Sequence, residues 1–218
     1  MTRARGKLPL PNPIDFAMAS DDALAGRARD GCRHSFDELA RRFQVRLLRF
    51  LQGRVRGIAD AEDLLQETLI RAYERMDQYD PARPFGTWLF TIAHRLAISH
   101  HRRAASSERG IEALVDRKRG AAVAAPDRQL ADQESRQLFW EMAASVLTQE
   151  QFSTVWLFYV EDMPAPQIAD VLGRSWVSVK TILFRARRKL MPHLQTPETV
   201  GLAPRVKQTR GVAALAVG

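Results

Sequence analysis

The 218-residue sequence has a single cysteine, Cys32, which excludes an internal disulfide framework and any zinc site built from several cysteines. It also lacks long apolar runs. The longest two, residues 155–160 and 212–217, have six residues each, whereas a membrane-spanning helix needs roughly 20. The basic N-terminus is followed by prolines rather than by the apolar stretch of a secretory signal. We therefore expect a soluble, cytoplasmic protein that does not enter a membrane.

The sequence also lacks the alternation of polar and apolar residues that a half-buried β-strand requires. Its apolar residues recur at intervals of three and four, which is the period of an α-helix. These patterns predict an all-α protein. The expected helices cover Asp21 to Ala28, about Phe36 to Gly53 with Ser35 as N-cap, about Asp60 to Tyr79, Phe85 to about Arg103, a segment from Leu138, and a segment that a capping box at Thr148–Gln151 begins.

Aromatic residues are absent between Ala104 and Gln133, where Ala, Arg, Ser, Gly and Asp dominate. This composition is typical of a linker and divides the chain into two small helical domains. The expected organisation is a disordered or partly helical arm over residues 1–30, a helical domain over 31–103, a flexible linker over 104–133, a second helical domain over 134–194 and a disordered tail over 195–218.

Basic residues outnumber acidic ones, with 33 Lys and Arg against 25 Asp and Glu and a formal net charge of +8. A protein of this charge is attracted to nucleic acid, to an anionic membrane surface or to an acidic protein. Charge alone does not choose among these partners.

Residues 165–183 have the spacing of a helix-turn-helix. Ala169 supplies the small residue at the helix contact, Gly173 tolerates a left-handed turn, and Ser175 can cap the second helix. The residues expected on the buried inner face are Ile168, Leu172, Val179 and Ile182.

The outward face of the second helix leads into a basic C-terminal part, with five basic residues and no acid from Lys180 to Lys189. Such a helix fits the major groove of duplex DNA, and the alternative is an ordinary helical hairpin with a solvated basic face. The candidate DNA-binding residues here are Trp176, Val177, Ser178, Lys180, Thr181, Phe184, Arg185, Arg187 and Arg188.

An acidic cluster stands out in the first domain. Asp60, Asp63 and Glu67 share one helical face in a stretch without basic residues. Carboxylates in a first helical turn favour the helix dipole, but Glu67 lies too deep for that effect, although Arg71 could pair with it. Because such a face repels phosphate, it suits a basic protein partner. The spacing leaves both readings open.

The helix after Pro84 combines aromatic residues with arginines, a combination that suits single-stranded nucleic acid. At helical spacing, however, Phe85, Trp88, Leu89 and Ile92 are better explained as core. His94, His100 and His101 show no metal-ligand arrangement, and no metal site or cofactor is predicted.

Two groups of motifs resemble the extracytoplasmic-function (ECF) sigma factors, a group within the sigma-70 family of bacterial RNA polymerase subunits. The first group resembles the second conserved region of that family and comprises residues 36–39, 60–68, 79–81 and 84–93. The second group resembles the fourth region and comprises residues 147–151, 167–169 and 179–187. Both occur in the family's order, with a linker between them.

The resemblance implies a transcription-initiation subunit without catalysis of its own, which binds core RNA polymerase and promoter DNA. The acidic helix would dock on the clamp helices of the β′ subunit, with Asp60, Asp63, Gln66 and Glu67 as candidates. The fourth region would meet the β flap and read the minus-thirty-five element, and an anti-sigma protein is a further partner that the family admits. The implied contacts with the single-stranded minus-ten element are Trp88, Arg95, Ser99, Arg102 and Arg103.

Two other function classes fit parts of the pattern. A stand-alone helix-turn-helix regulator would bind operator DNA as a dimer and leave a two-fold symmetric footprint. A helical nuclease would hold Mg²⁺ with Asp60, Asp63 and Glu67, although acids on consecutive turns of one helix make a poor metal site.

Overall fold

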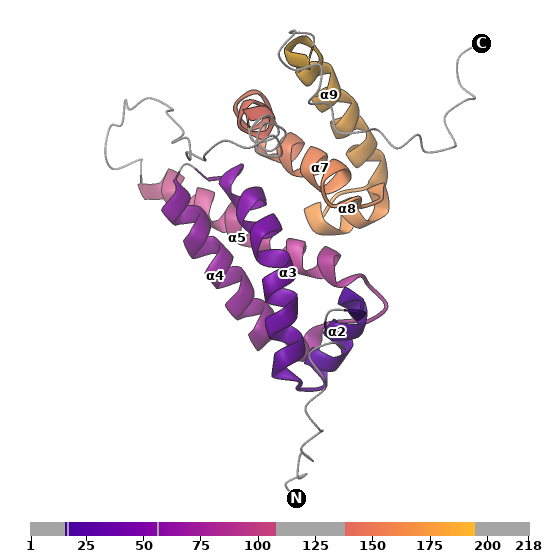
Figure 1. The fold of residues 1–218 in the computed structure, drawn as a ribbon. Helices are drawn as coiled ribbons and strands as arrows, with labels where there is room; N and C mark the ends of the chain where they lie inside the picture. Colours follow the sequence, from indigo (N-terminus) through magenta and orange to yellow (C-terminus); the bar gives the residue numbers. More distant parts are fainter. Residues whose placement is uncertain (1–15, 17, 56, 108–137, 195–218) are drawn as a thin grey trace, which may run out of the picture.

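The computed structural model describes residues 16, 18–55, 57–107 and 138–194, and within these ranges the protein is helical and contains no strand (Figure 1). The all-α prediction is confirmed. The elements are α2 (Asp21–Arg29), α3 (Arg33–Gln52), α4 (Ile58–Glu74), the 3₁₀ turn η1 (Met76–Gln78), α5 (Phe85–Ser107), a helical segment over residues 138–146, α7 (Gln149–Tyr159), α8 (Ala165–Leu172) and α9 (Trp176–Leu194).

Local sequence accounts for several helix ends. Ser20 caps α2 by accepting a hydrogen bond from the Ala23 N–H (3.2 Å). The predicted capping box is present at α7, where Thr148 and Gln151 each bond the other's backbone N–H. Helix α3 ends at Gly53, as predicted.

The prediction that Ser35 caps α3 is wrong. The helix begins at Arg33 with Cys32 at the N-cap position, and Ser35 lies fully buried inside the first turn. The reason is the tight connection to α2, in which Gly31 adopts a φ of 98° and turns the chain at once into α3. No polar side chain is left to occupy the cap.

Helix α5 differs from expectation at its C-terminal end. It continues to Ser107, past residue 104 where the linker was predicted to start, and residues 108–133 of that linker lie outside the described ranges. The predicted tail over 195–218 and most of the predicted N-terminal arm also lie outside them. At the N-terminal end of α5, the Phe85 N–H donates to Asp22 Oδ1 (2.8 Å), so a residue 63 positions earlier in the chain caps α5.

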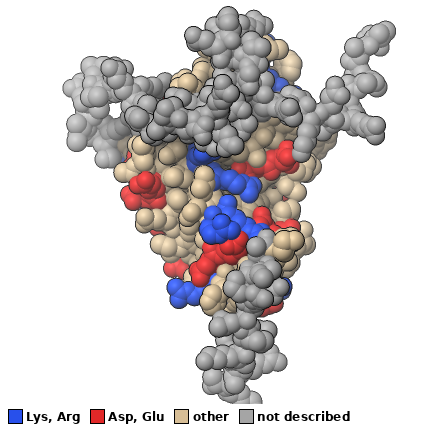
Figure 2. All heavy atoms as spheres, viewed as in Figure 1, with Lys and Arg blue, Asp and Glu red and all other residues tan. Residues whose placement is uncertain are grey.

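The chain forms two helical halves (Figure 1). In the N-terminal half, α3 packs against α2 and α4, and α5 packs against α4. In the C-terminal half, α9 packs against α7 and α8. Acidic and basic side chains are interspersed on the face seen in Figure 2, so no single charge dominates that view.

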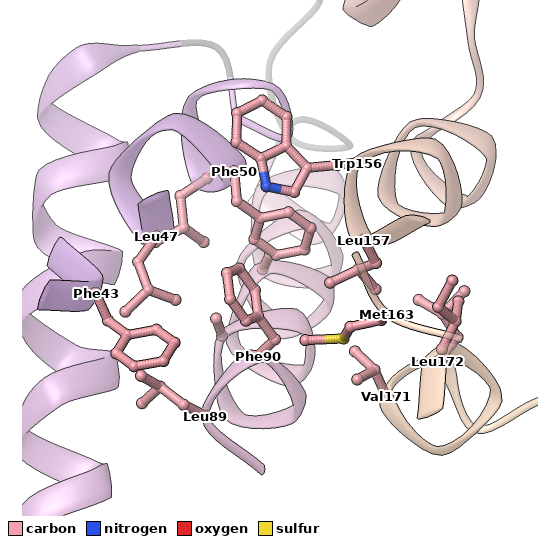
Figure 3. Close-up of a cluster of buried hydrophobic side chains, with 14 of the residues drawn as sticks. Phe43, Leu47, Phe50, Leu89, Phe90, Trp156, Leu157, Met163, Val171 and Leu172 are labelled. Atoms are coloured by element: carbon pink, nitrogen blue, oxygen red, sulfur yellow. The ribbon is translucent and has the colours of Figure 1, made fainter. Parts of the chain in front are cut away.

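The two halves are in direct contact, because α8 packs against α5 (Figure 1). Figure 3 shows the buried side chains that meet there, with Phe50 and Phe90 from the N-terminal half facing Leu157 and Met163 from the C-terminal half. Gly53 lies directly against the Phe152 ring, and a Cβ placed on Gly53 would clash with that ring. We call this contact the junction.

In the described part of the chain, none of the helices combines the length and apolar content needed to cross a membrane.

Candidate nucleic-acid and protein interfaces

Helices α8 and α9 form the predicted helix-turn-helix. Gly173 ends α8 in the left-handed conformation (φ 63°, ψ 41°), and Ala169 is buried at the helix contact. Ser175 caps α9 by accepting a hydrogen bond from the Ser178 N–H (3.2 Å). The local geometry thus follows from the residue types that the sequence places in the turn.

The division into inner and outer faces also agrees with the prediction. Ile168, Leu172 and Val179 are buried, while Ile182 is half-buried. Of the nine candidate DNA-binding residues, Ser178 is half-buried and the rest are exposed, namely Trp176, Val177, Lys180, Thr181, Phe184, Arg185, Arg187 and Arg188. The structure therefore leaves the candidate face open to a partner, and its contact with DNA stays a prediction.

Contacts within the protein orient two of these cations. Lys180 Nζ lies 4.4 Å from the centroid of the Trp176 ring. Arg187 Nε donates to the Tyr159 hydroxyl (2.8 Å), and its guanidinium lies over the rings of Phe158 and Tyr159. These contacts restrict side chains that would otherwise lose entropy on binding. A shallow hollow beside them is lined by Gln151, Thr181, Phe184, Arg185, Arg188 and Lys189.

The four residues of α4 that are candidates for binding core polymerase differ in exposure. Asp63 and Gln66 are exposed, whereas Asp60 and Glu67 are half-buried. Glu67 accepts a hydrogen bond from Arg71 Nε (2.6 Å), which confirms the predicted pair, and Asp60 lies 3.7 Å from His100 Nε2. The structure therefore places all four candidates on one helix, and among the described residues it pairs Glu67 and Asp60 with basic side chains while Asp63 faces solvent.

A groove between α3 and α4 adjoins these acids and was not predicted. Its lining combines polar side chains with Val45, Leu48 and Leu65. Val45 is 51% exposed, so the groove offers apolar surface to a partner. An apolar residue on the polar side of α3 was the available signal in the sequence. The lining residues are Gln44, Val45, Leu48, Glu62, Leu65 and Gln66.

Helix α5 carries the candidate single-strand residues. Arg95, Arg102 and Arg103 are exposed, and Ser99 is half-buried. Trp88 is half-buried, with ring centroids of Tyr79 and Phe85 at 5.5 and 5.8 Å.

Some of the apolar side chains of α5 therefore belong to the core. Phe85 and Leu89 are buried, as the sequence predicted. The Tyr79 hydroxyl donates to the Arg83 carbonyl (2.8 Å) and ties down the connection before α5. Burial raises the pKa of Tyr79 to about 12, so the hydroxyl stays protonated and can donate.

Polar groups in the junction form a cluster that could not be predicted from the sequence pattern. Arg54 is 3% exposed, hydrogen-bonds to the Ser153 hydroxyl and lies with Nη1 3.1 Å from His94 Nδ1. The Arg54 carbonyl accepts from Gln149 Nε2 (3.0 Å). Burial lowers the pKa of Arg54 to about 10, and burial together with the nearby Arg54 charge lowers that of His94 to about 3.

A second polar contact in the junction joins Arg46 to Glu161, whose side chain is fully buried. Burial raises the pKa of Glu161, and the hydrogen bond from Arg46 opposes that rise. Both polar contacts join the two halves, since Arg46 and Arg54 belong to one half and their partners include residues of the other.

In the described ranges, no three His, Cys, Asp or Glu residues come together in a way that could hold a metal ion. The Mg²⁺ site considered for Asp60, Asp63 and Glu67 is therefore not assembled on α4.

Two family models match the chain. Sigma-70 region 2 matches residues 39–107, and Sigma-70 region 4 matches residues 140–190. The first contains α4, α5, the groove and the acidic face, and the second contains the helix-turn-helix.

Curated proteins and solved structures agree with these matches. The chain is 30% identical to RNA polymerase sigma factor CnrH of Cupriavidus metallidurans over 82% of this chain and 94% of CnrH. It is 29% identical to ECF RNA polymerase sigma factor BldN of Streptomyces coelicolor over 77% of this chain, and the match spans 63% of BldN. The structure of CnrH in complex with the cytosolic domain of CnrY superposes with a TM-score of 0.58, at 26% identity over 80% of this chain and 96% of that one.

Proposed function

The chain belongs to the ECF group of sigma-70 RNA polymerase sigma factors, and from this premise we propose how its surfaces divide the work of starting transcription. One surface binds core polymerase, and two others bind promoter DNA. The observation that carries the proposal is the separation of two surfaces: a partly apolar groove on α3 and α4 with the acidic face of α4 beside it, and a basic, acid-free face on α9. Such opposite surfaces suit a protein partner and a polyanion, respectively.

Core polymerase docks on the groove and the acidic face beside it. Val45 supplies apolar area, while Asp63 and Gln66 supply exposed polar contacts to the basic clamp helices of the β′ subunit. The β flap meets the C-terminal half. Asp60 and Glu67 contribute less to this contact, because each already lies beside a basic side chain within the chain.

Promoter DNA is bound at two places. The exposed arginines of α5, with Trp88 and Ser99, hold the unpaired strand of the minus-ten element by phosphate contact and stacking. The outer face of α9 enters the major groove of the minus-thirty-five element, which remains duplex. Free energy from these contacts and from docking holds a few base pairs open. The chain itself needs no catalytic activity, because the polymerase carries the chemistry, and it works with that polymerase in the cytoplasm.

Binding both promoter elements requires the two halves to separate. The elements are about 25 base pairs apart, or about 85 Å at roughly 3.4 Å per base pair. A compact chain of this size has a radius of gyration of about 17 Å and is about 45 Å wide. The 30 residues between 107 and 138 can span about 100 Å when extended. The junction therefore opens when the chain engages a promoter.

A partner that holds the halves together would act as an inhibitor. CnrH was solved bound to the cytosolic domain of CnrY. We infer that an anti-sigma protein binds this chain in the closed arrangement, in which the two halves are in contact across the junction. A dimeric helix-turn-helix regulator is the weaker candidate, because it gives no role to the groove on α3 and α4.

The test reconstitutes the full chain with sigma-free core polymerase and measures binding and promoter-dependent transcription. A variant with Asp63→Lys and Gln66→Lys should bind core at least tenfold more weakly, because it reverses the charge of the exposed part of the face. Asp77→Lys combined with Gln78→Lys, an equal charge change at exposed sites on η1, is the control and should bind normally. Equal binding by both variants, or core binding without any promoter-dependent transcript, would contradict the proposal.

A further inference from the structure

We propose that α9 reads its DNA element largely through thymine methyl groups, contacted by Val177 and Phe184, while Lys180 reads a guanine between them. This inference rests on the proposed function and names the base pairs that the same surface recognises.

The first argument is the exposure of large apolar side chains on a helix that is otherwise basic. Val177 is 54% exposed and Phe184 65% exposed, and they stand seven residues apart on one helical face. The helix has five basic residues and no acid from Lys180 to Lys189, so its partner is a polyanion. In the major groove of duplex DNA, the apolar group that such side chains can contact is the C5 methyl of thymine.

The second argument is that the small hydroxyl side chains of this face are already engaged. The Ser178 hydroxyl is 2.8 Å from the Ser175 hydroxyl, and Ser178 is half-buried. The Thr181 hydroxyl donates to the Val177 carbonyl (3.2 Å). The Thr181 donor is thus used within the helix and the Ser178 hydroxyl is paired with that of Ser175, which favours the apolar side chains and Lys180 as the groups that distinguish one base from another.

The third argument concerns the position of Lys180. Its ammonium group lies 4.4 Å from the Trp176 ring centroid, in the first turns of α9, and keeps N–H donors that do not face the ring. Lysine donors match the N7 and O6 acceptors of guanine. Trp176 is then a positioning residue that holds Lys180 toward the major groove of the DNA.

The spacing is consistent with one continuous element. Seven residues of α-helix rise about 10 Å, which corresponds to about three base pairs at roughly 3.4 Å each. Val177, Lys180 and Phe184 can therefore address neighbouring base pairs, while Arg185 and Arg188 lie farther along toward the phosphates.

The experiment starts from promoter duplexes randomised over the minus-thirty-five region. The full chain, reconstituted with core polymerase, transcribes this library, and sequencing of the active templates gives the preferred element. Each thymine of that element is then replaced by deoxyuridine, which lacks only the methyl group. We expect uracil at two positions to lower affinity about fourfold each, the equivalent of one buried carbon.

Matched variants assign the contacts. Val177→Ala should abolish the effect of uracil at one position and Phe184→Ala at the other, whereas Phe184→Leu, which keeps an apolar side chain, should retain sensitivity. Trp176→Ala should weaken the guanine preference with Lys180 intact, and Trp176→Phe should restore it. All three sites are exposed, so folding is little affected.

Two outcomes are decisive and distinct. If the library yields a defined element whose uracil templates are as active as thymine templates at every position, the methyl readout is wrong while the sigma-factor proposal stands. If no template gives a promoter-dependent transcript, the proposed function fails and this inference fails with it.

Discussion

Burial in the junction shifts the pKa values of single residues, and His94 has a strongly lowered pKa. It is 6% exposed, and burial together with the Arg54 charge lowers its pKa to about 3 from an ordinary value of 6.5. In the folded protein the ring therefore stays neutral at pH values where the unfolded chain would bind a proton. Folding thus becomes coupled to pH through this residue.

The sign of the coupling is fixed by the direction of the shift. Because the folded-state pKa is lowered, the contribution of His94 to stability is complete above pH 6.5 and falls as the pH drops from 6.5 toward 3. At pH 5 the expected loss is about 2 kcal/mol. Urea denaturation of the native chain and of His94→Gln at pH 7 and pH 5 should show the larger drop in the native chain.

Glu161, in the other polar contact of the junction, has a raised pKa and so acts in the opposite direction: its contribution to stability is lost as the pH rises. It is the same in both proteins, so its effect cancels in the comparison. Identical pH dependence of the native chain and His94→Gln would show that His94 does not govern this coupling.

At the scale of single elements, the sequence predicted what local chemistry decides. The capping box at Thr148, the left-handed Gly173 and the cap at Ser175 follow from residue types within a few positions of each other. Long-range features could not be predicted in this way. Asp22 caps α5, and Arg54 contacts Ser153. Both contacts join residues far apart in the chain, so the local sequence pattern does not predict them.

The turn between α8 and α9 offers a direct test of local control. Gly173 has a φ of +63°, and a Cβ added to it would meet no atom within 4 Å. Gly173→Ala should therefore cost about 1 kcal/mol of unfolding free energy through backbone strain alone. Gly173→Asn, which tolerates this conformation better, should cost less when both are measured by chemical denaturation. An alanine variant as stable as the native chain would rule out strain at this turn.

The groove between α3 and α4 gives the second prediction at this scale. Val45→Asp should weaken binding to core polymerase by at least tenfold, because it places a charge in an apolar contact. The fold should be unaffected, since Val45 is 51% exposed. Val45→Thr keeps the shape of the side chain and should lose much less. Fluorescence titration of labelled core measures both, and equal affinities for the two variants would remove Val45 from the interface.

At the scale of the whole molecule, contact between the two halves across the junction affects which partners the chain can bind at the same time. In the closed arrangement, the residues proposed to contact core polymerase and DNA are exposed or half-buried, so closure leaves these surfaces accessible. Closure instead limits the distance between the two DNA-binding surfaces, because a compact chain cannot extend over two separated promoter elements. Inhibition by closure would therefore affect promoter use more than docking on core polymerase.

Chemical cross-linking can separate these two effects. Arg83 and Asp170 are exposed, belong to opposite halves and approach to 3.9 Å. In a Cys32→Ser background, Arg83→Cys and Asp170→Cys joined by a short bifunctional maleimide would hold the junction closed. The linked chain should still bind core polymerase but lose most promoter-dependent transcription, whereas the same variant without the reagent should keep it.

A matched pair within one half controls for the reagent itself. Glu150 and Arg174 form an exposed contact (2.7 Å) between α7 and the turn before α9. Cysteines at these two positions, linked in the same way, constrain the C-terminal half but leave the halves free to separate, so transcription should persist. Full transcription by the chain linked through positions 83 and 170 would mean that the closed arrangement can use a promoter, and the proposed opening of the junction would then be wrong.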